Sequence, residues 1–490
     1  MTKKNASSAE RMSNFAASQA TSGTESPGLV RALGPWMSTA VVVGGVIGSG
    51  IFAKPGEIAA SCGDFRIILT AWIVGGLFSL WGTLCFAELA TMLPQAGGIY
   101  VYLREAYGNL TAFLFGFSEF LFGRPASIGA LAMFSASILL KHVPQFNSLW
   151  WQTGLALVLI AAASWVNVRG VLWGGHVLGW TTLVKSLFIV FIAMTPFVLS
   201  GIGLDAGVDA ANYSTRVEPK FNSYWQQFAA VLLAVMWAYN GWHDVGPVAE
   251  EIKDPQRNIP IAYFLGIGII IALYVGVNLA YHGVLTMREV AQAGIETPQR
   301  AMSRFLAPGG SGLIRMAHLL MDGSILCSAL GAANANLLLG PRISFAMGRD
   351  GTFAKFLGGI HGAYRTPHWS IIVQGTMSCG YLVVAALMIQ NLPAFREKNP
   401  FDLLTDTIVY SASLFFMLSV LGVMVLRRSH PEWPRPYRTW GYPLTPILFL
   451  VGNGVFLGMA VQAKPLEGLL GLFLTLFGLP AYWIWNRRKV

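Results

Sequence analysis

The chain has 490 residues, of which 54% are hydrophobic and only 11% are charged. A soluble domain of this length cannot bury so much apolar surface, so the composition excludes an ordinary soluble enzyme and indicates a membrane protein. We interpret the formal net charge of +10 as Lys and Arg in cytosolic loops, and we expect no nucleic-acid partner.

The N-terminal residues 1–32 are rich in Ser, Ala and Thr and lack the apolar core of a cleavable signal peptide. We expect a disordered cytosolic tail there, followed by one transmembrane domain over residues 33–486 and a short basic cytosolic end at residues 487–490. Lys and Arg are concentrated in alternate predicted loops, most clearly at 342–365 and 427–438. This asymmetry predicts a multi-pass protein of the cell membrane with both termini in the cytosol.

Apolar runs between charged or Pro- and Gly-rich breaks predict about twelve transmembrane helices, since about 20 residues span a hydrocarbon core of about 30 Å. The first six are expected at 36–59, 66–93, 111–140, 149–168, 174–200 and 224–249. The other six are expected at 260–285, 312–346, 369–391, 403–426, 443–462 and 466–486. The predicted fold class is therefore an all-α polytopic membrane protein.

Two of these predicted helices contain residues that disfavour a continuous helix in mid-membrane. The first carries Gly44-Gly45-Val46-Ile47-Gly48-Ser49-Gly50 and the sixth carries Tyr239-Asn240-Gly241. An interior Gly costs about 1 kcal/mol, and interrupted helices at matching places in two repeats mark the binding site of inverted-repeat transporters. We expect repeats at 33–200 and 224–426, with helices 11 and 12 added at 443–486. Close helix packing is the alternative explanation for these glycines, above all for Gly44 and Gly45.

Motifs along most of the chain resemble those of one transporter family. The matching residues are Gly45-Val46-Ile47-Gly48-Ser49-Gly50-Ile51-Phe52 with Pro55-Gly56, Glu88-Leu89, Gly97-Gly98, Arg104-Glu105-Ala106, Arg124-Pro125, Val166-Asn167, Trp237-Ala238-Tyr239-Asn240-Gly241-Trp242, Glu250-Glu251, Asn258-Ile259-Pro260, Arg342, Gly348-Arg349-Asp350-Gly351 and Arg435-Pro436-Tyr437. They resemble the amino acid-polyamine-organocation (APC) superfamily, in its L-type amino acid transporter branch. The resemblance implies a LeuT-like fold of five plus five helices, with discontinuous helices 1 and 6.

The loop after the third predicted helix departs from the animal members of this branch. Those proteins carry a Cys there that joins them to a single-span glycoprotein subunit, whereas residues 141–147 of this chain contain none. We therefore expect a stand-alone, prokaryotic-type carrier without a covalently linked heavy chain.

Broken helices suit an amino acid, because their free peptide dipoles replace the water that its two charges lose. The expected substrate-binding residues are Ile47, Gly48, Ser49, Gly50 and Ile51 of helix 1 and Trp237, Ala238, Tyr239, Asn240 and Gly241 of helix 6. N–H groups near Gly50 would meet the carboxylate. The resemblance implies that carbonyls of Ile47 and of helix 6 meet the ammonium, and that Trp237 is a lid; an ordinary core Trp is the alternative.

Lys185 lies about 11 residues into the fifth predicted helix, or about 16 Å along it, which is too deep for a Lys side chain to reach the surface. The resemblance implies that its charge ties helices 1, 5 and 8 together where related carriers use sodium. We therefore expect sodium-independent transport, with Ser328 and Asn334 as candidate partners. A Lys facing a water-filled vestibule is the alternative, and exchange and proton-coupled uptake both stay open.

Other charged residues are candidates for gating or structural pairs. Arg124 lies deep in the third predicted helix, where Glu119 or helix-end carbonyls are possible partners. The remaining group lies near predicted cytosolic helix ends, where salt bridges would close an inward gate, and it consists of Glu88, Glu250, Glu251, Arg104 and Arg342.

The predicted function is exchange of neutral amino acids, because no acidic residue is expected in either broken segment to receive a cationic side chain. A carrier of cationic amino acids or polyamines and a transporter-derived nutrient sensor are the alternatives. The spans contain no HExxH, no GxSxG and no grouped His. The four cysteines are scattered without metal-ligand spacing. We expect no enzyme activity, no metal site and no cofactor.

Overall fold

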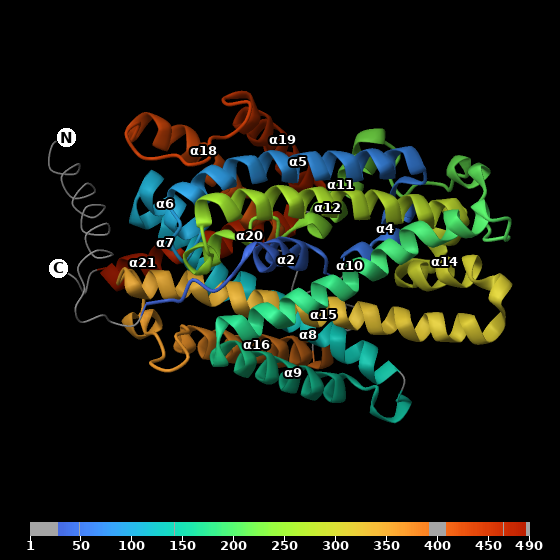
Figure 1. Cartoon of the computed structure of the whole chain (residues 1–490), viewed down its shortest axis with the longest axis horizontal. Helices are drawn as coiled ribbons and strands as arrows, with labels where there is room; N and C mark the ends of the chain where they lie inside the picture. The colour runs from blue at the N-terminus through green and yellow to red at the C-terminus, as the bar shows by residue number, and fades with distance from the viewer. Residues whose placement is uncertain (1–27, 49, 142, 392–407, 464, 487–490) are drawn as a thin grey trace.

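The computed structural model describes residues 28–48, 50–141, 143–391, 408–463 and 465–486. Over these ranges the chain forms a bundle of helices that run mostly along its longest axis, and extended pairing is limited to two isolated bridges (Figure 1). Ten helices within the described ranges are long and apolar enough to cross a membrane, and residues 471–485 add a shorter apolar stretch. The predicted polytopic all-α fold is confirmed.

The first five predicted helices are all present, and two of them are interrupted. Helix 1 is divided into α2, α3 and α4, and helix 3 contains a π-helical turn. The bounds are α2 Pro35–Val46, α3 Gly50–Ala53, α4 Pro55–Cys62, α5 Phe65–Met92, α7 Asn109–Ser118, the π-helix η1 Glu119–Gly123, α8 Arg124–Lys141, α9 Leu149–Arg169 and α10 Val171–Gly201.

The sixth predicted helix, 224–249, is interrupted at the predicted Tyr239-Asn240-Gly241, but its second half is not α-helical. Helix α11 ends ten residues early, at Tyr239, and a turn over residues 240–245 leads into the 3-10 helix η4. The later bounds are α11 Tyr224–Tyr239, η4 Gly246–Glu251, α12 Pro255–Val284, α15 Gly310–Arg349, α16 His368–Asn391, α18 Ile408–Ser429, α19 Leu444–Ala463, α20 Pro465–Leu476 and α21 Gly478–Asn486.

Several short helices were not predicted, because each is too short to show a clear apolar period. Helix α13 nevertheless has a sequence signal: Thr286 and Glu289 form a reciprocal capping box at its start. The helices are α6 Ile99–Tyr107, α13 Met287–Ala293 and α14 Thr297–Phe305, with 3-10 turns η2 Pro144–Phe146, η3 Ala210–Ser214, η5 Gly294–Glu296, η6 Ala307–Gly309 and η7 Lys355–Gly358.

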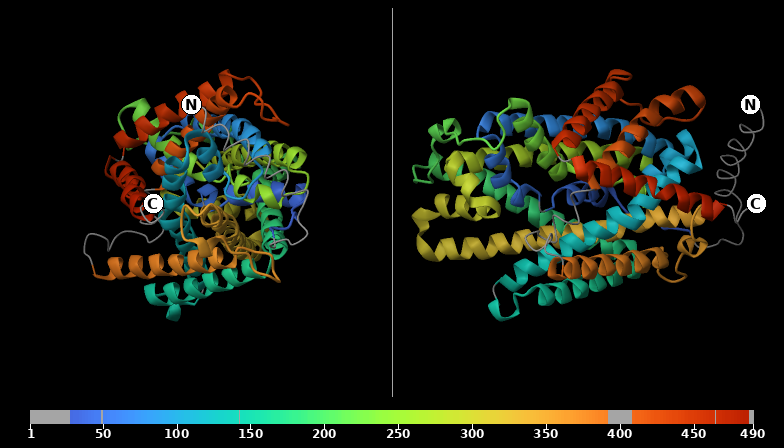
Figure 2. Two further views of the ribbon diagram at one scale, coloured as in Figure 1. Left: turned by 90° about the vertical axis from the view of Figure 1, so that its left-hand side faces the viewer. Right: turned by 180° about the vertical axis from the view of Figure 1, so that it is seen from behind.

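The packing of the long helices is reciprocal. Helix α2 lies in the middle of the bundle against α12, while α11 lies against α5, so the first helix of each predicted repeat contacts the second helix of the other. Helices α9 and α16 lie side by side along one edge, away from α18 and α19 (Figure 2). This arrangement is what five-helix inverted repeats produce. The exact repeat boundaries stay a prediction.

The two ends of the bundle carry different elements. Helices α6 and α21 lie at one end, on the left of Figure 1, and α4 and α14 lie at the other. The first described residues also lie at the α6 end, since Arg365 after α15 donates to the carbonyl of Gly28 at 3.1 Å. That this end faces the cytosol stays a prediction, and the expected tail and basic end fall mainly on residues 1–27 and 487–490, outside the described ranges.

Candidate functional site

Helix 1 is broken where the sequence predicted. Helix α2 ends at Val46 and α3 begins at Gly50, while Ser49 lies outside the described residues. The carbonyls freed at the end of α2 are satisfied by side chains of other helices: the Ser328 hydroxyl donates to Ile47 at 3.1 Å and to Gly48 at 3.0 Å. A helix end buried in a membrane protein needs such partners, so these hydrogen bonds stabilise the break in helix 1.

Helix 6 is broken at Asn240, and one tyrosine joins the two breaks. The backbone of Gly241 has φ +109°, which favours glycine, and it lies against Gly45 of α2. The Tyr274 hydroxyl on α12 lies 3.1 Å from the carbonyl of Val46 and 3.1 Å from that of Ala238. Tyr274 therefore holds the last turn of α2 beside the last turn of α11, a role that the sequence analysis did not identify.

Lys185 extends from α10 to the broken end of α2. Its amine donates to the carbonyl of Gly44 at 2.8 Å and also to that of Ile47. The side chain is fully buried, which argues against the alternative of a water-filled vestibule. Because Ser328 of α15 bonds to the same Ile47 carbonyl, α2, α10 and α15 meet at this point as predicted.

Asn334, the other candidate partner of Lys185, lies elsewhere. Its side chain donates to the carbonyl of Gly174 at 3.1 Å and accepts from Asn167 at 2.8 Å. Asn334 therefore joins α15 to the end of α9 and the start of α10. The helix assignment was right, but the sequence could not give the rotation of α15 that separates Asn334 from Ser328.

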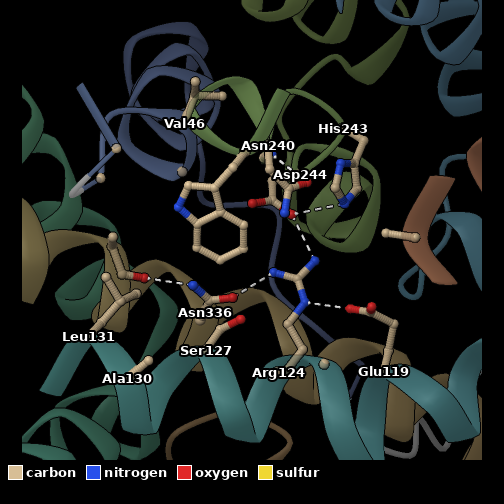
Figure 3. Close-up of a pocket in the computed structure, with 18 of the residues that line it drawn as sticks. Val46, Glu119, Arg124, Ser127, Ala130, Leu131, Asn240, His243, Asp244 and Asn336 are labelled. Carbon is tan, nitrogen blue, oxygen red and sulfur yellow. Dashed lines mark hydrogen bonds and ion pairs between the residues drawn. The ribbon is translucent and has the colours of Figure 1, made fainter. Parts of the chain in front are cut away.

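The two breaks line one cavity of about 90 Å3 (Figure 3). Among the predicted binding residues, Gly48, Gly50, Trp237, Ala238, Asn240 and Gly241 line it. Ile47, Ile51 and Tyr239 are buried in the surrounding core instead, and the Tyr239 hydroxyl donates to the carbonyl of Trp72 at 3.2 Å. Further lining residues come from α2, the α7–α8 helix, α15 and α18, and include Gly45, Ser127, Ala332, Asn336 and Phe416.

A buried ionic cluster forms one wall of the cavity. Arg124 donates to Glu119 at 2.9 Å, to Asn336 at 2.9 Å and to Asp244 at 2.8 Å (Figure 3). The predicted pairing of Arg124 with Glu119 is confirmed. It depends on the π-helical turn between them, because a wider turn brings residues five apart onto one face. Arg124 therefore connects α8 with α15 and with the helix-6 turn.

Asp244 overturns an expectation from the sequence. No acidic residue was expected in either broken segment, because the interruption of helix 6 was predicted only at Tyr239-Asn240-Gly241. Since α11 ends at Tyr239, Asp244 belongs to the turn, is 4% exposed and lines the cavity beside His243. The glycine at 241 was the available signal for where the irregular segment begins.

The remaining charged candidates lie at the α6 end, outside the cavity. The Glu88 carboxylate accepts two hydrogen bonds from the Arg427 guanidinium, at 2.8 and 2.6 Å, and one from the Thr439 N–H at 2.7 Å. The bonds to Arg427 connect α5 to α18. Glu251 and Arg342 form a fully buried pair at 2.8 Å. Glu250 pairs with Arg349 at 3.0 Å, and Arg104 pairs with Asp350. These ion pairs cross-link the predicted cytosolic end.

Gly50 offers a direct test of the contact between the breaks. A Cβ built on Gly50 would lie 2.9 Å from both Cα and Cβ of Ala238, which is too close for carbon atoms. We expect Gly50→Ala to push α3 away from α11 and to lower transport at least tenfold. Transport by Gly28→Ala should stay at the wild-type level, because a Cβ there meets open space. Normal transport by Gly50→Ala would contradict the observed contact.

Comparison with known proteins agrees with this geometry. The family model described as amino acid permease matches residues 33–469. The chain is 31% identical to the serine/threonine exchanger SteT of Bacillus subtilis (strain 168), over 95% of this chain and 99% of that protein. It is 28% identical to the human b(0,+)-type amino acid transporter 1, over 94% and 89%. It is also 27% identical to the mouse large neutral amino acids transporter small subunit 2, over 95% and 83%. The chain therefore belongs to the amino acid permease family of the APC superfamily and is a transporter rather than an enzyme.

Proposed function

We propose that this permease exchanges neutral L-amino acids across the cell membrane without sodium. The observation that carries the proposal is the cavity between two broken helices, lined by Gly48 and Gly50 on one side and by Trp237 to Gly241 on the other. Peptide groups at broken helix ends can hold a carboxylate and an ammonium inside a membrane. Trp237 then covers the bound substrate. The exchanger named among the relatives supports the exchange mode.

Charge balance favours a neutral substrate. Two buried cations, Lys185 and Arg124, lie at or beside the cavity together with two carboxylates, Glu119 and Asp244. Their formal charges sum to zero, so a zwitterion adds no net charge to the low-dielectric site. A further unpaired charge would cost several kcal/mol there.

A carrier of cationic amino acids or polyamines is the second candidate, and Asp244 and Glu119 in the cavity wall are the observations that favour it. Both carboxylates are paired with Arg124, however, at 2.8 and 2.9 Å. A substrate with an extra positive charge would have to compete with this guanidinium. We therefore rank it below the neutral substrate.

Sodium independence rests on the position of Lys185. Its amine donates to carbonyls of Gly44 and Ile47 at the broken end of α2. Exposed carbonyls of this kind attract a cation, and the amine of Lys185, tethered to α10, occupies that position. The loop without Cys at 141–147 supports operation without a covalently linked subunit.

Counterflow in proteoliposomes tests the proposal. We expect labelled leucine or alanine to exchange against the same unlabelled amino acid at equal rates in sodium and choline buffers. Labelled arginine and putrescine serve as competing substrates. Uptake of these two alone would establish the second candidate. A flux without saturation or trans-stimulation would indicate a channel, and amino acid binding without flux would indicate a sensor.

A further inference from the structure

One end of the cavity carries polar groups with unused bonding capacity. Asp244 Oδ1 accepts the hydrogen bond from Arg124 at 2.8 Å, whereas no described residue donates to Oδ2. His243 Nδ1 is buried without a partner among the described residues, and the Ser127 hydroxyl makes no hydrogen bond within the same ranges. Figure 3 shows Ser127 on α8, opposite the turn that carries His243 and Asp244.

The free oxygen of Asp244 also has a defined position. A Cβ built on Gly45 would lie 2.8 Å from Oδ2, so this oxygen lies directly over α2, next to the break. Only glycine at position 45 leaves room for it. An ionised carboxylate is an acceptor on both oxygens, and a buried acceptor without a donor is unfavourable. The cavity therefore presents an acceptor that a ligand can satisfy.

On the basis of the exchange function proposed above, we propose that Asp244 Oδ2 accepts a hydrogen bond from the substrate side chain. The permease then selects neutral amino acids whose side chains carry a hydrogen-bond donor, such as a hydroxyl or a carboxamide. Ser127 and His243 complete this subsite by bonding to the same group. A cationic side chain is disfavoured because the buried charges around the site already cancel.

Discrimination between substrates of equal shape is the signature of such a subsite. Threonine and valine differ mainly in one hydroxyl, so an apolar pocket binds them about equally. A subsite built around a charged acceptor favours the hydroxyl, because valine leaves Oδ2 unbonded. We expect threonine to compete about 10- to 100-fold more strongly than valine against labelled alanine in counterflow.

Two variants of this subsite should lose the preference by different routes. Asp244→Ala removes the acceptor, whereas Gly45→Ala keeps the carboxylate but places a methyl group within 2.8 Å of Oδ2, so that this oxygen must shift from its position over α2. Glu119→Ala is the matched control, because it also deprives Arg124 of a carboxylate but spares Asp244. We expect the threonine-to-valine ratio to fall to about one in the first two variants and to stay near the wild-type value in Glu119→Ala.

The ratio is internally normalised, so lower expression of a variant does not alter it. If Asp244→Ala fails to fold, Gly45→Ala alone decides the role of Oδ2. A wild-type ratio near one, or an unchanged ratio in Gly45→Ala, would overturn the subsite while leaving amino acid exchange intact. Absence of any amino acid counterflow by the wild type would instead contradict the proposed function itself.

Discussion

Replacing Lys185 with alanine should lower amino acid exchange about 100-fold or more, the largest effect on transport that we expect from one side chain. The amine donates to the carbonyls of Gly44 and Ile47 at the end of α2. Without it Ile47 keeps the hydrogen bond from Ser328, whereas the Gly44 carbonyl loses its side-chain donor. Each buried acceptor left unbonded costs about 1–3 kcal/mol. A cost of about 3 kcal/mol reduces the population of the ordered break by about 100-fold.

Two other substitutions calibrate this result. Ser328→Ala removes two hydrogen bonds at the same break, to Ile47 and Gly48, but no charge, and should have a smaller effect. Lys355→Ala removes an exposed lysine of η7 and should exchange normally. Initial rates of labelled alanine counterflow, corrected for reconstituted protein, provide the measurement. Wild-type exchange by Lys185→Ala would show that the amine is not needed to hold the break.

Replacing Glu251 with alanine should destabilise the protein by about 3–5 kcal/mol, the largest effect that we expect on folding. Glu251 and Arg342 are both fully buried. The Arg342 guanidinium donates two hydrogen bonds to the Glu251 carboxylate, at 2.8 and 3.2 Å, and a third to the carbonyl of Leu338. Removing the carboxylate leaves a guanidinium buried without a counter-charge. The free energy of unfolding in detergent, or the midpoint of thermal unfolding, provides the measurement.

The neighbouring residue supplies the control. Glu250 pairs with Arg349 across a partly exposed interface, with 24% and 37% of the two side chains accessible. Solvent screens such a pair, so Glu250→Ala should cost only about 1 kcal/mol. A double variant, Glu251→Leu with Arg342→Met, should recover much of the lost stability, because no unpaired charge remains. Equal losses for Glu250→Ala and Glu251→Ala would contradict this account.

The long helices were predictable because a run of apolar residues of bilayer length has one favourable state. The predicted 66–93, 149–168 and 369–391 correspond to α5 Phe65–Met92, α9 Leu149–Arg169 and α16 His368–Asn391. A spanning helix satisfies all of its backbone groups internally, so the bilayer enforces what the sequence pattern indicates. The break at Ile47 and Gly48 was predictable for the opposite reason, since several small residues weaken a helix in succession.

The cavity wall was harder to predict because it depends on helix rotation and on the exact end of α11. Asn336 and Asn334 differ by two positions on α15, yet one bonds to Arg124 and the other to Asn167. Asp244 lines the cavity only because the six residues 240–245 form a turn instead of a regular helix before η4. The pattern of apolar residues in the sequence indicates neither the rotation of α15 nor the extent of the turn after α11.

The presence of two cations, Lys185 and Arg124, beside two carboxylates, Glu119 and Asp244, has an electrical consequence. Moving one elementary charge through a membrane potential of 100 mV involves about 2.3 kcal/mol. When a zwitterion binds to a site whose own charges sum to zero, the loaded site has no net charge, so moving the substrate across the membrane in either direction involves none of this electrical work. For such a substrate, voltage does no work on the exchange step, and the concentration ratios of the two amino acids alone set its direction.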